Sequence, residues 1–362
     1  MGLEGGGRGQ GGGVTTALPP LVFSATYGSQ SRHGTALRRD ARRGLLHRVH
    51  PGAYVEAADW ARLDRRGRHV LTTRAVVAGL SPRVVVSHGS AVALHRLPSV
   101  DWPRGPVHVI DPGRERTQAT ARVVRHPGPI DAHDTVEIDG LVVTSEGRTA
   151  VDRSRTASFA DGVLCVDAVL RRAAARTGCF EASDRRDPRR SAGHRSLVDA
   201  AADGMRRLLF ERLDREPGTR GLSTARGVMA FATPWAENGG ESLCRLALLE
   251  LGAPEPAMQV EFFDDEGLAG RCDFVIGDAA LEFDGKAKYD DAAMRAGQVP
   301  SAVVKAEKAR ERRLVRSGGI SAIGRCDAED VALRLPLARI LRDLDVELRP
   351  RQNARMWPHR QV

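Results

Sequence analysis

The chain has 362 residues, enough for two or three domains that each bury a hydrophobic core. Charged residues make up 28% of the chain and apolar residues 41%, and no window approaches about 18 consecutive apolar residues, which argues against a membrane protein. The five cysteines form no CxxC pair, which argues against a zinc ribbon and favours a reducing compartment, so we predict a cytoplasmic protein.

The net charge of +9 is unevenly distributed along the chain. Residues 1–80 hold 12 arginines and 5 acidic residues, a charge of +7, whereas residues 241–330 hold 12 basic and 18 acidic residues, a charge of −6. Neutralisation of phosphates gives a basic module a sequence-independent affinity for nucleic acid. The basic end therefore predicts DNA as a partner, with a solvated, arginine-rich surface as the alternative.

Glycine dominates residues 1–17, which we expect to form a flexible tail, and residues 18–80 predict a small DNA-binding domain. A helix over His33–Arg43 ends at Gly44, and strands over residues 45–50 and 53–55 flank the turn dipeptide Pro51-Gly52. A helix followed by a hairpin is the order of a winged helix, and the alternative is a scaffold for protein contacts. The side chains expected to contact DNA are Arg38, Arg39, Arg42, Arg43 and Arg48.

Residues 82–172 predict an α+β module. Strands are expected over residues 106–111 and 121–125, and residues 136–143 form a hairpin signature with Asp-Gly at the turn. His88 and His95 are seven residues apart and would share a helix face, but no third ligand lies at metal spacing, so we predict packing or capping roles for them.

Three stretches of these first 172 residues carry a resemblance to a known family: Arg38–Val55, Ser87–Pro98 and Thr144–Asp152, where the pair Thr144-Ser145 predicts a helix N-cap. Their order and spacing resemble the N-terminal part of AbiEi-type antitoxins and related actinobacterial regulators. The resemblance implies a winged helix with a following domain, DNA binding and repression of a promoter.

Residues 173–235 predict a partly helical connector without chemistry of its own. The charged stretch Ser183–Arg190 is expected to be an exposed loop, and Leu197–Leu213 shows helical spacing.

Residues 236–346 predict a third domain with the element order α-β-β-β-α-β, followed by a basic tail over residues 347–362. The elements are expected over residues 241–252, 258–263, 271–276, 280–284, 304–316 and 320–325. The chain is thus predicted to be an α/β protein of the multidomain α+β kind.

Acidic side chains converge in this third domain. Alternate positions of a strand face one side, so Glu282 and Asp284 project together and Asp273 of the neighbouring strand can join them. Like-charged carboxylates repel unless a cation lies between them, and all-oxygen ligation suits Mg²⁺ or Mn²⁺. The cluster therefore predicts a metal that activates water against a phosphodiester, with acids on a solvated edge as the alternative.

This order and these residues resemble the PD-(D/E)XK nuclease superfamily, and more closely its very-short-patch-repair-like branch with a restriction-endonuclease-like core. The resemblance implies that Glu241, Asp273 and Glu282 hold the metal. It also matches the pattern of the next helix through Glu307, Lys308, Arg310 and Glu311, of which Lys308 and Arg310 are expected to bind DNA.

Two departures from the superfamily concern the catalytic lysine and the last strand. Asp284 stands where the commonest pattern has lysine, and Lys286 and Lys288 come later, so all three join the candidate catalytic residues. Arg325 is followed by Cys326, where relatives often have tryptophan.

Two function classes follow from the sequence. The chain is a magnesium-dependent DNA endonuclease whose N-terminal module supplies affinity, or it is a non-catalytic DNA-binding regulator or antitoxin that binds a toxin or another partner protein. Neither class involves a membrane.

Overall fold

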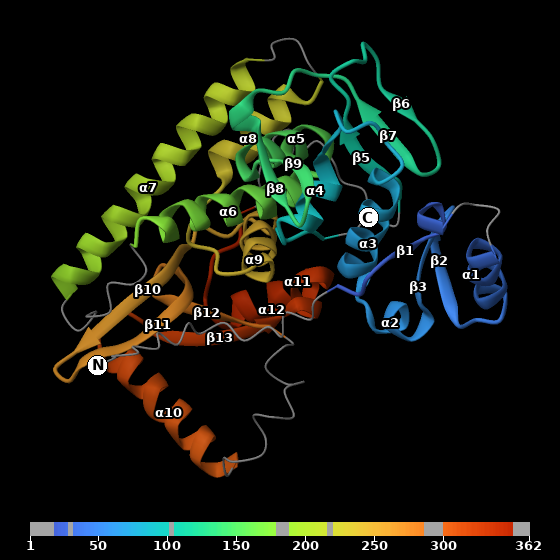
Figure 1. The fold of residues 1–362 in the computed structure, drawn as a ribbon. Helices are drawn as coiled ribbons and strands as arrows, with labels where there is room; N and C mark the ends of the chain where they lie inside the picture. Colours follow the sequence, from blue (N-terminus) through green and yellow to red (C-terminus); the bar gives the residue numbers. More distant parts are fainter. Residues whose placement is uncertain are drawn as a thin grey trace, which may run out of the picture.

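The computed structural model describes residues 18–27, 32–100, 105–178, 188–215, 220–285 and 300–349. These residues form a mixed α/β protein with three β-sheets (Figure 1). Within these ranges, no helix is long and apolar enough to cross a membrane. The predicted tail over residues 1–17 lies outside the described residues, as does most of the predicted basic tail.

A three-stranded sheet forms the N-terminal module, at the right of Figure 1. Its strands, in spatial order, are β1 (Val22–Phe23), β3 (Ala53–Glu56) and β2 (Leu46–His50). The short 3-10 helix η1 (Ser24–Tyr27) precedes α1 (Arg32–Arg42), which ends near Gly44, where φ is +75° and glycine is free of strain. Strands β2 and β3 pair antiparallel around Gly52. The predicted helix and hairpin are therefore both confirmed.

The next two helices connect this module to the middle of the chain. They are α2 (Ala57–Arg62) and α3 (Arg65–Val77). In α3, Val70 packs in one cluster with Val86 and Val143, and Val76 packs in another with Val107. The core of the middle module thus extends across the predicted boundary near residue 80.

The middle module contains a six-stranded mixed sheet. Its strands, in spatial order, are β6 (Gln118–Ala119), β7 (Val123–His126), β5 (Val107–Ile110), β4 (Val85–Val86), β9 (Leu141–Thr144) and β8 (Thr135–Ile138). The β8–β9 hairpin turns at Asp139 (φ +51°) and Gly140 (φ +76°), as the Asp-Gly signature predicts. A short 3-10 helix, η2 (Ala132–Asp134), precedes β8.

Five helices complete the middle module, and they include the stretch predicted to be a connector. They are α4 (His88–Leu94), α5 (Glu146–Thr156), α6 (Phe159–Arg176), α7 (Pro188–Asp214) and α8 (Leu222–Phe231). Ser145 caps α5 by accepting from Arg148 N, as predicted.

Helix α7 differs from the predicted connector in length and in burial. It begins at Pro188, inside the stretch predicted to be an exposed loop, whereas residues 183–187 lie outside the described residues. Its residues Ala202, Leu209 and Leu213 lie along one helix face and are buried against α5, α6 and α8. Burial of this apolar stripe is the physical reason that the segment is part of a core.

The C-terminal module has the predicted order α-β-β-β-α-β. Its elements are α9 (Gly239–Glu250), β10 (Ala257–Asp264), β11 (Gly267–Ile276), β12 (Ala279–Asp284), α10 (Pro300–Arg316) and β13 (Ala322–Asp327), followed by α11 (Ala328–Leu333) and α12 (Leu335–Asp343). The sheet order is β10-β11-β12-β13, and only the last pair is parallel among the described pairs.

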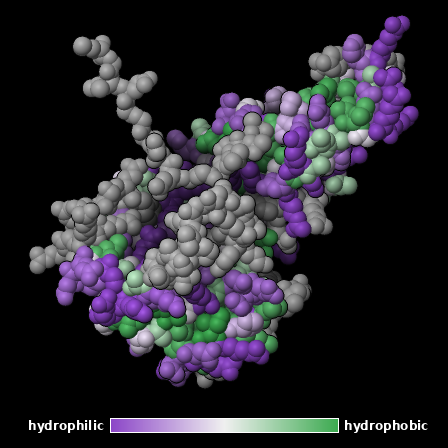
Figure 2. All heavy atoms as spheres, turned by 90° about the horizontal axis from the view of Figure 1, so that it is seen from below, coloured by the Kyte–Doolittle hydropathy of each residue, from purple (hydrophilic) through white to green (hydrophobic). Residues whose placement is uncertain are grey.

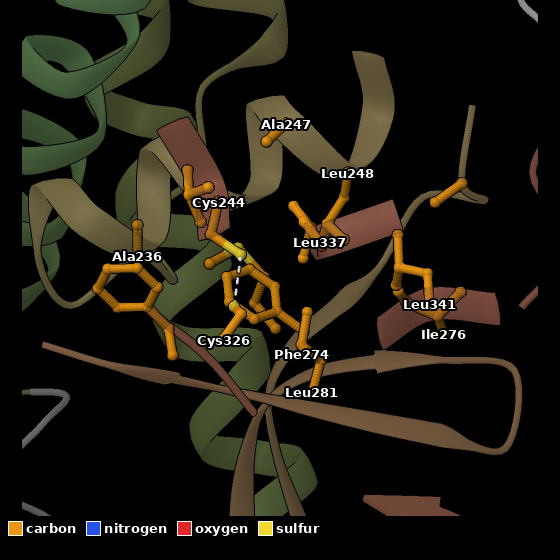
Figure 3. Packing of buried hydrophobic residues seen from close by; sticks show 14 of the residues in the cluster. Ala236, Cys244, Ala247, Leu248, Phe274, Ile276, Leu281, Cys326, Leu337 and Leu341 are labelled. Carbon is orange, nitrogen blue, oxygen red and sulfur yellow. Dashed lines mark hydrogen bonds between the residues drawn. The ribbon is translucent and has the colours of Figure 1, made fainter. Parts of the chain in front are cut away.

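Helix α9 is held against this sheet by a buried apolar core (Figure 3). Leu248 and Cys244 of α9 point toward Phe274 and Leu281 of the sheet, and Cys244 Sγ lies 3.7 Å from Cys326 Sγ of β13. This packing fixes the first turn of α9, and therefore Glu241, beside the central strands.

Candidate metal centre

Glu241 is placed by the start of α9. Asn238 caps the helix by accepting from Glu241 N at 3.0 Å. The adjoining Gly240 packs against Phe283 so closely that an added Cβ would lie 2.3 Å from the ring, which only a glycine permits. The helix start can therefore approach β12, and the Glu241 residue is only 4% exposed.

Asp273 and Glu282 come from the two central antiparallel strands. Phe274 pairs with Leu281, so Asp273 and Glu282 occupy the next positions of the register. Asp273 Oδ2 accepts from the backbone N–H of Phe283 at 3.0 Å. The predicted meeting of these two acids is thus present, and together with Glu241 we call them the acid cluster.

Gln259 of β10 links two members of the acid cluster. Its Nε2 donates to Glu241 Oε2 at 3.0 Å and to Asp273 Oδ1 at 3.3 Å. Glu241 accepts two further hydrogen bonds, from Glu237 N at 2.8 Å and Asn238 Nδ2 at 2.7 Å. The sequence analysis did not identify Gln259, although this residue lies on β10, the strand that directly precedes the strand of Asp273 and pairs with it.

The pKa values of two carboxyl groups in the acid cluster, Glu241 and Asp273, are raised. Burial, together with the charge of Asp273, raises the pKa of Glu241 to about 7. Burial also raises the pKa of Asp273, with the charge of Glu282 acting in the same direction. Two adjacent carboxyl groups that resist ionisation are the electrostatic condition under which a cation binds favourably.

Arg310 already supplies a positive charge to one member of the cluster. Its Nη2 donates to Glu282 Oε1 at 2.6 Å and to the carbonyl oxygen of Arg271 at 2.7 Å. The Arg310 side chain is about one-third exposed. Arg310 was predicted to bind DNA, and the structure places it in this ion pair, where it connects α10 to the acid cluster.

The other predicted site residues lie apart from these hydrogen bonds or outside the described residues. Asp284 is half-buried at the end of β12, two residues beyond Glu282. Lys308 is exposed on α10. Lys286 and Lys288 lie outside the described residues, so their predicted catalytic roles stay predictions.

The acid cluster fits a hard divalent cation in the chemistry of its donors. Carboxylate oxygens are the usual ligands of Mg²⁺ and Mn²⁺. Gln259 faces Glu241 and Asp273 with its Nε2, whereas its Oε1 is buried and, among the described residues, has no hydrogen-bond partner. In the arrangement seen here, no three His, Cys, Asp or Glu side chains of the described chain are positioned to share one ion. Glu282 instead pairs with Arg310, and the amide of Gln259 lies between Glu241 and Asp273.

A cavity of about 420 Å³ adjoins the acid cluster and is lined in part by Glu237 and Gln259, both of which donate a hydrogen bond to Glu241. Arg171 and Arg271 both place Nη2 about 3 Å from Glu237 Oε1. The guanidinium of Arg195 stacks over the Trp235 ring at 4.0 Å on another wall. The surroundings of the acid cluster are thus rich in arginine, although the module as a whole is acidic.

The arginines predicted to bind DNA lie on the surface of the N-terminal module. Arg38, Arg39, Arg42 and Arg43 are on or directly after α1, Arg48 is on β2, and all five are exposed. At the right-hand end of the molecule, where α1 and β2 lie in Figure 1, Figure 2 shows hydrophilic residues at the tip and hydrophobic residues beside them. Arg39 and Asp40 form a weak pair at 3.4 Å, so most of this charge faces solvent.

A second group of titratable side chains, buried or partly buried, lies in the middle module. The histidine cluster consists of His88, His108 and His126: the His88 and His126 rings stack at 3.8 Å, and His108 Nδ1 lies 2.9 Å from His126 Nε2. Burial lowers the pKa of His108 to about 4 and lowers that of His88 well below its usual value. His95, whose predicted packing role is confirmed, lies with Nε2 2.6 Å from the carbonyl oxygen of Thr144.

Comparison of the chain with protein-family models, with curated proteins and with solved structures found no significant match. The functional proposal is therefore built on the residues and geometry of this chain.

Proposed function

We propose that the chain is a DNA-binding protein whose C-terminal module hydrolyses DNA phosphodiester bonds with Mg²⁺ or Mn²⁺. The observation that supports this most is the acid cluster. Asp273 and Glu282 lie on neighbouring strands, each next to the paired residues Phe274 and Leu281, and Gln259 links Glu241 to Asp273 by hydrogen bonds. The carboxyl groups come from a helix and two strands of an α-β-β-β-α-β module. This is the order that the nuclease resemblance predicts.

Asp273 and Glu282 would hold the metal, with Glu241 beside them. When bound, a divalent metal supplies a Lewis acid for a phosphoryl oxygen and an acidified water. Glu241, whose pKa burial raises to about 7, can accept a proton from water near neutral pH. The guanidinium of Arg310, once released from Glu282, would face the anionic substrate from α10.

The charge distribution supports a division of labour between the ends of the chain. An acidic module repels DNA, so the exposed arginines of α1 and β2 would provide the affinity. We propose that α1 and the β2–β3 hairpin act as a winged helix, with α1 toward the groove and Arg48 on the hairpin toward a phosphate.

One observation favours a second candidate function, a non-catalytic DNA-binding regulator or antitoxin. Arg310 already neutralises Glu282, so the acid cluster has an internal cation. In that case the N-terminal module would still bind DNA, and the C-terminal module would serve as a scaffold or bind a partner protein.

Nicking of supercoiled plasmid by the purified full chain separates the two functions. We expect nicking with Mg²⁺ or Mn²⁺, none with EDTA, and loss of nicking in Asp273→Asn. Asp278→Asn is the matched control, because Asp278 is an exposed aspartate in the turn between β11 and β12. Absence of nicking, or equal nicking by Asp273→Asn, would exclude the endonuclease. DNA binding retained by such an inactive chain would favour the regulator.

A further inference from the structure

Gln259 has an unusual backbone conformation for its place in the fold. It lies inside β10, between Met258, which pairs with Phe274, and Val260, which pairs with Cys272. Its φ is +52°, in the left-handed region that side chains other than glycine rarely adopt within a strand. Such conformations persist only where surrounding interactions impose them, and they concentrate at functional sites.

The side chain of Gln259 carries a second unfavourable feature. The residue is 4% exposed, and its Oε1 is buried without a hydrogen-bond partner among the described residues. A buried, unpaired carbonyl oxygen destabilises the folded state. An apolar side chain of the same size would avoid this loss.

Both unfavourable features accompany one favourable interaction. The two oxygens nearest to the amide, Glu241 Oε2 and Asp273 Oδ1, are acceptors, so the NH₂ group must face them. Each of its two N–H groups can serve one carboxylate. The orientation of the Gln259 amide is therefore determined by Glu241 and Asp273, because no partner of Oε1 among the described residues contributes to it.

We infer that Gln259 is a positioning residue that holds Glu241 and Asp273 together so that a divalent cation can bind on the other side of Asp273, between Asp273 and Glu282. The inference rests on the proposed function for the identity of the site. A neutral donor suits this role, because it bridges two like charges without neutralising either of them. A lysine at this position would instead act as a competing cation.

The test is the affinity of the full chain for Mn²⁺, measured by electron paramagnetic resonance of the free ion. Gln259→Met keeps the length of the side chain but removes both N–H donors, and we expect affinity to fall at least tenfold. Gln259→Asn tolerates the left-handed backbone but is too short to reach both acids, and an intermediate loss is expected. Gln118→Met, at an exposed glutamine of β6, is the matched control and should leave affinity unchanged.

A second readout separates positioning from a general effect on folding. In ¹⁵N spectra, the side-chain NH₂ signal of Gln259 should shift on addition of Mg²⁺ to the wild type and stay in place in Asp273→Asn. Unchanged or higher Mn²⁺ affinity in a folded Gln259→Met would overturn the inference, as would a wild type that binds no Mn²⁺. If Gln259→Met unfolds, the Asn variant and the NH₂ signal decide.

The inference and the proposed function can fail separately. A wild type that binds Mn²⁺ through Gln259 but does not nick DNA would remove the endonuclease and leave the positioning role. A wild type that nicks DNA and binds Mn²⁺, with neither property changed in Gln259→Met, would overturn the positioning role and leave the endonuclease.

Discussion

The histidine cluster of the middle module and the acid cluster of the C-terminal module each combine one buried residue with two partly buried ones, and burial acts on the two clusters with different results. The histidines lose their charge, and His108 and His126 lie within hydrogen-bonding distance of each other. The carboxyl groups cannot pair with one another in this way when ionised, so they take donors from Gln259 and Arg310. Neutral histidines can hydrogen-bond to one another, whereas ionised carboxyl groups require donors from other residues.

Substitutions that remove one charge from the acid cluster should have the largest effect. We expect Glu282→Gln to lower Mg²⁺-dependent plasmid nicking by about 100-fold or more, because a neutral amide is a weak ligand for a hard cation. His108→Gln, which makes a similar change in the other cluster, should nick at close to the wild-type rate. Equal losses in the two variants would mean that both act through folding and would remove the contrast between the clusters.

The histidine cluster should control stability at acidic pH. The folded pKa of His108, about 4, lies below its ordinary value of 6.5, so the unfolded chain binds the proton more readily. The contribution of His108 to the free energy of unfolding is therefore fully present above about pH 6.5. As pH decreases toward 4, about 3 kcal/mol of the free energy of unfolding is lost through His108 alone. Urea denaturation over this pH range should show the decline in the wild type and a flatter curve in His108→Gln. An unchanged curve would exclude protonation of His108 as the cause.

Removal of the Arg310 guanidinium should strengthen metal binding at the acid cluster. Arg310→Ala frees Glu282, and we expect Mn²⁺ affinity to rise by roughly fivefold, because the partly exposed ion pair contributes about 1 kcal/mol. Arg312→Ala, at an exposed position on the same helix, is the control. Weaker Mn²⁺ binding in Arg310→Ala would instead show that the guanidinium supports the site.

The smallest expected effects concern single arginines of the N-terminal module. We expect Arg42→Ala and Arg48→Ala each to weaken DNA binding a few-fold and to reduce the salt slope by about 1, as for the loss of one phosphate contact. Fluorescence anisotropy at several salt concentrations measures both quantities. Arg339→Ala, at an exposed arginine of the C-terminal module, should change neither. A similar loss in Arg339→Ala would place the DNA-binding surface elsewhere.

The sequence predicts the C-terminal elements well because their signals are local. Periodicity and turn residues define α9 and the strands, and alternation within a strand places Glu282 on one face of the sheet. The capping box of Asp327 and Asp330, which opens α11, is also a local signal, and it was missed.

The interactions that complete the site depend on contacts between distant segments. Arg310 reaches Glu282 from a helix 28 residues later, and Gln259 meets Glu241 from a strand 18 residues later. Likewise, His108 and His126 meet only because β5 and β7 pair in parallel with a particular register. Pattern alone gives the face on which a residue lies, but not the side chain opposite it.

The most direct test of the central claim is the number of Mn²⁺ ions bound per chain at neutral pH. Equilibrium titration would measure it in the wild type and in the variants Asp273→Asn, Glu282→Gln and His108→Gln. The account predicts a site in the wild type and in His108→Gln that is lost in Asp273→Asn and in Glu282→Gln. A wild type that binds no Mn²⁺, or Asp273→Asn and Glu282→Gln variants that bind it as the wild type does, would contradict the assignment of the acid cluster as a metal centre.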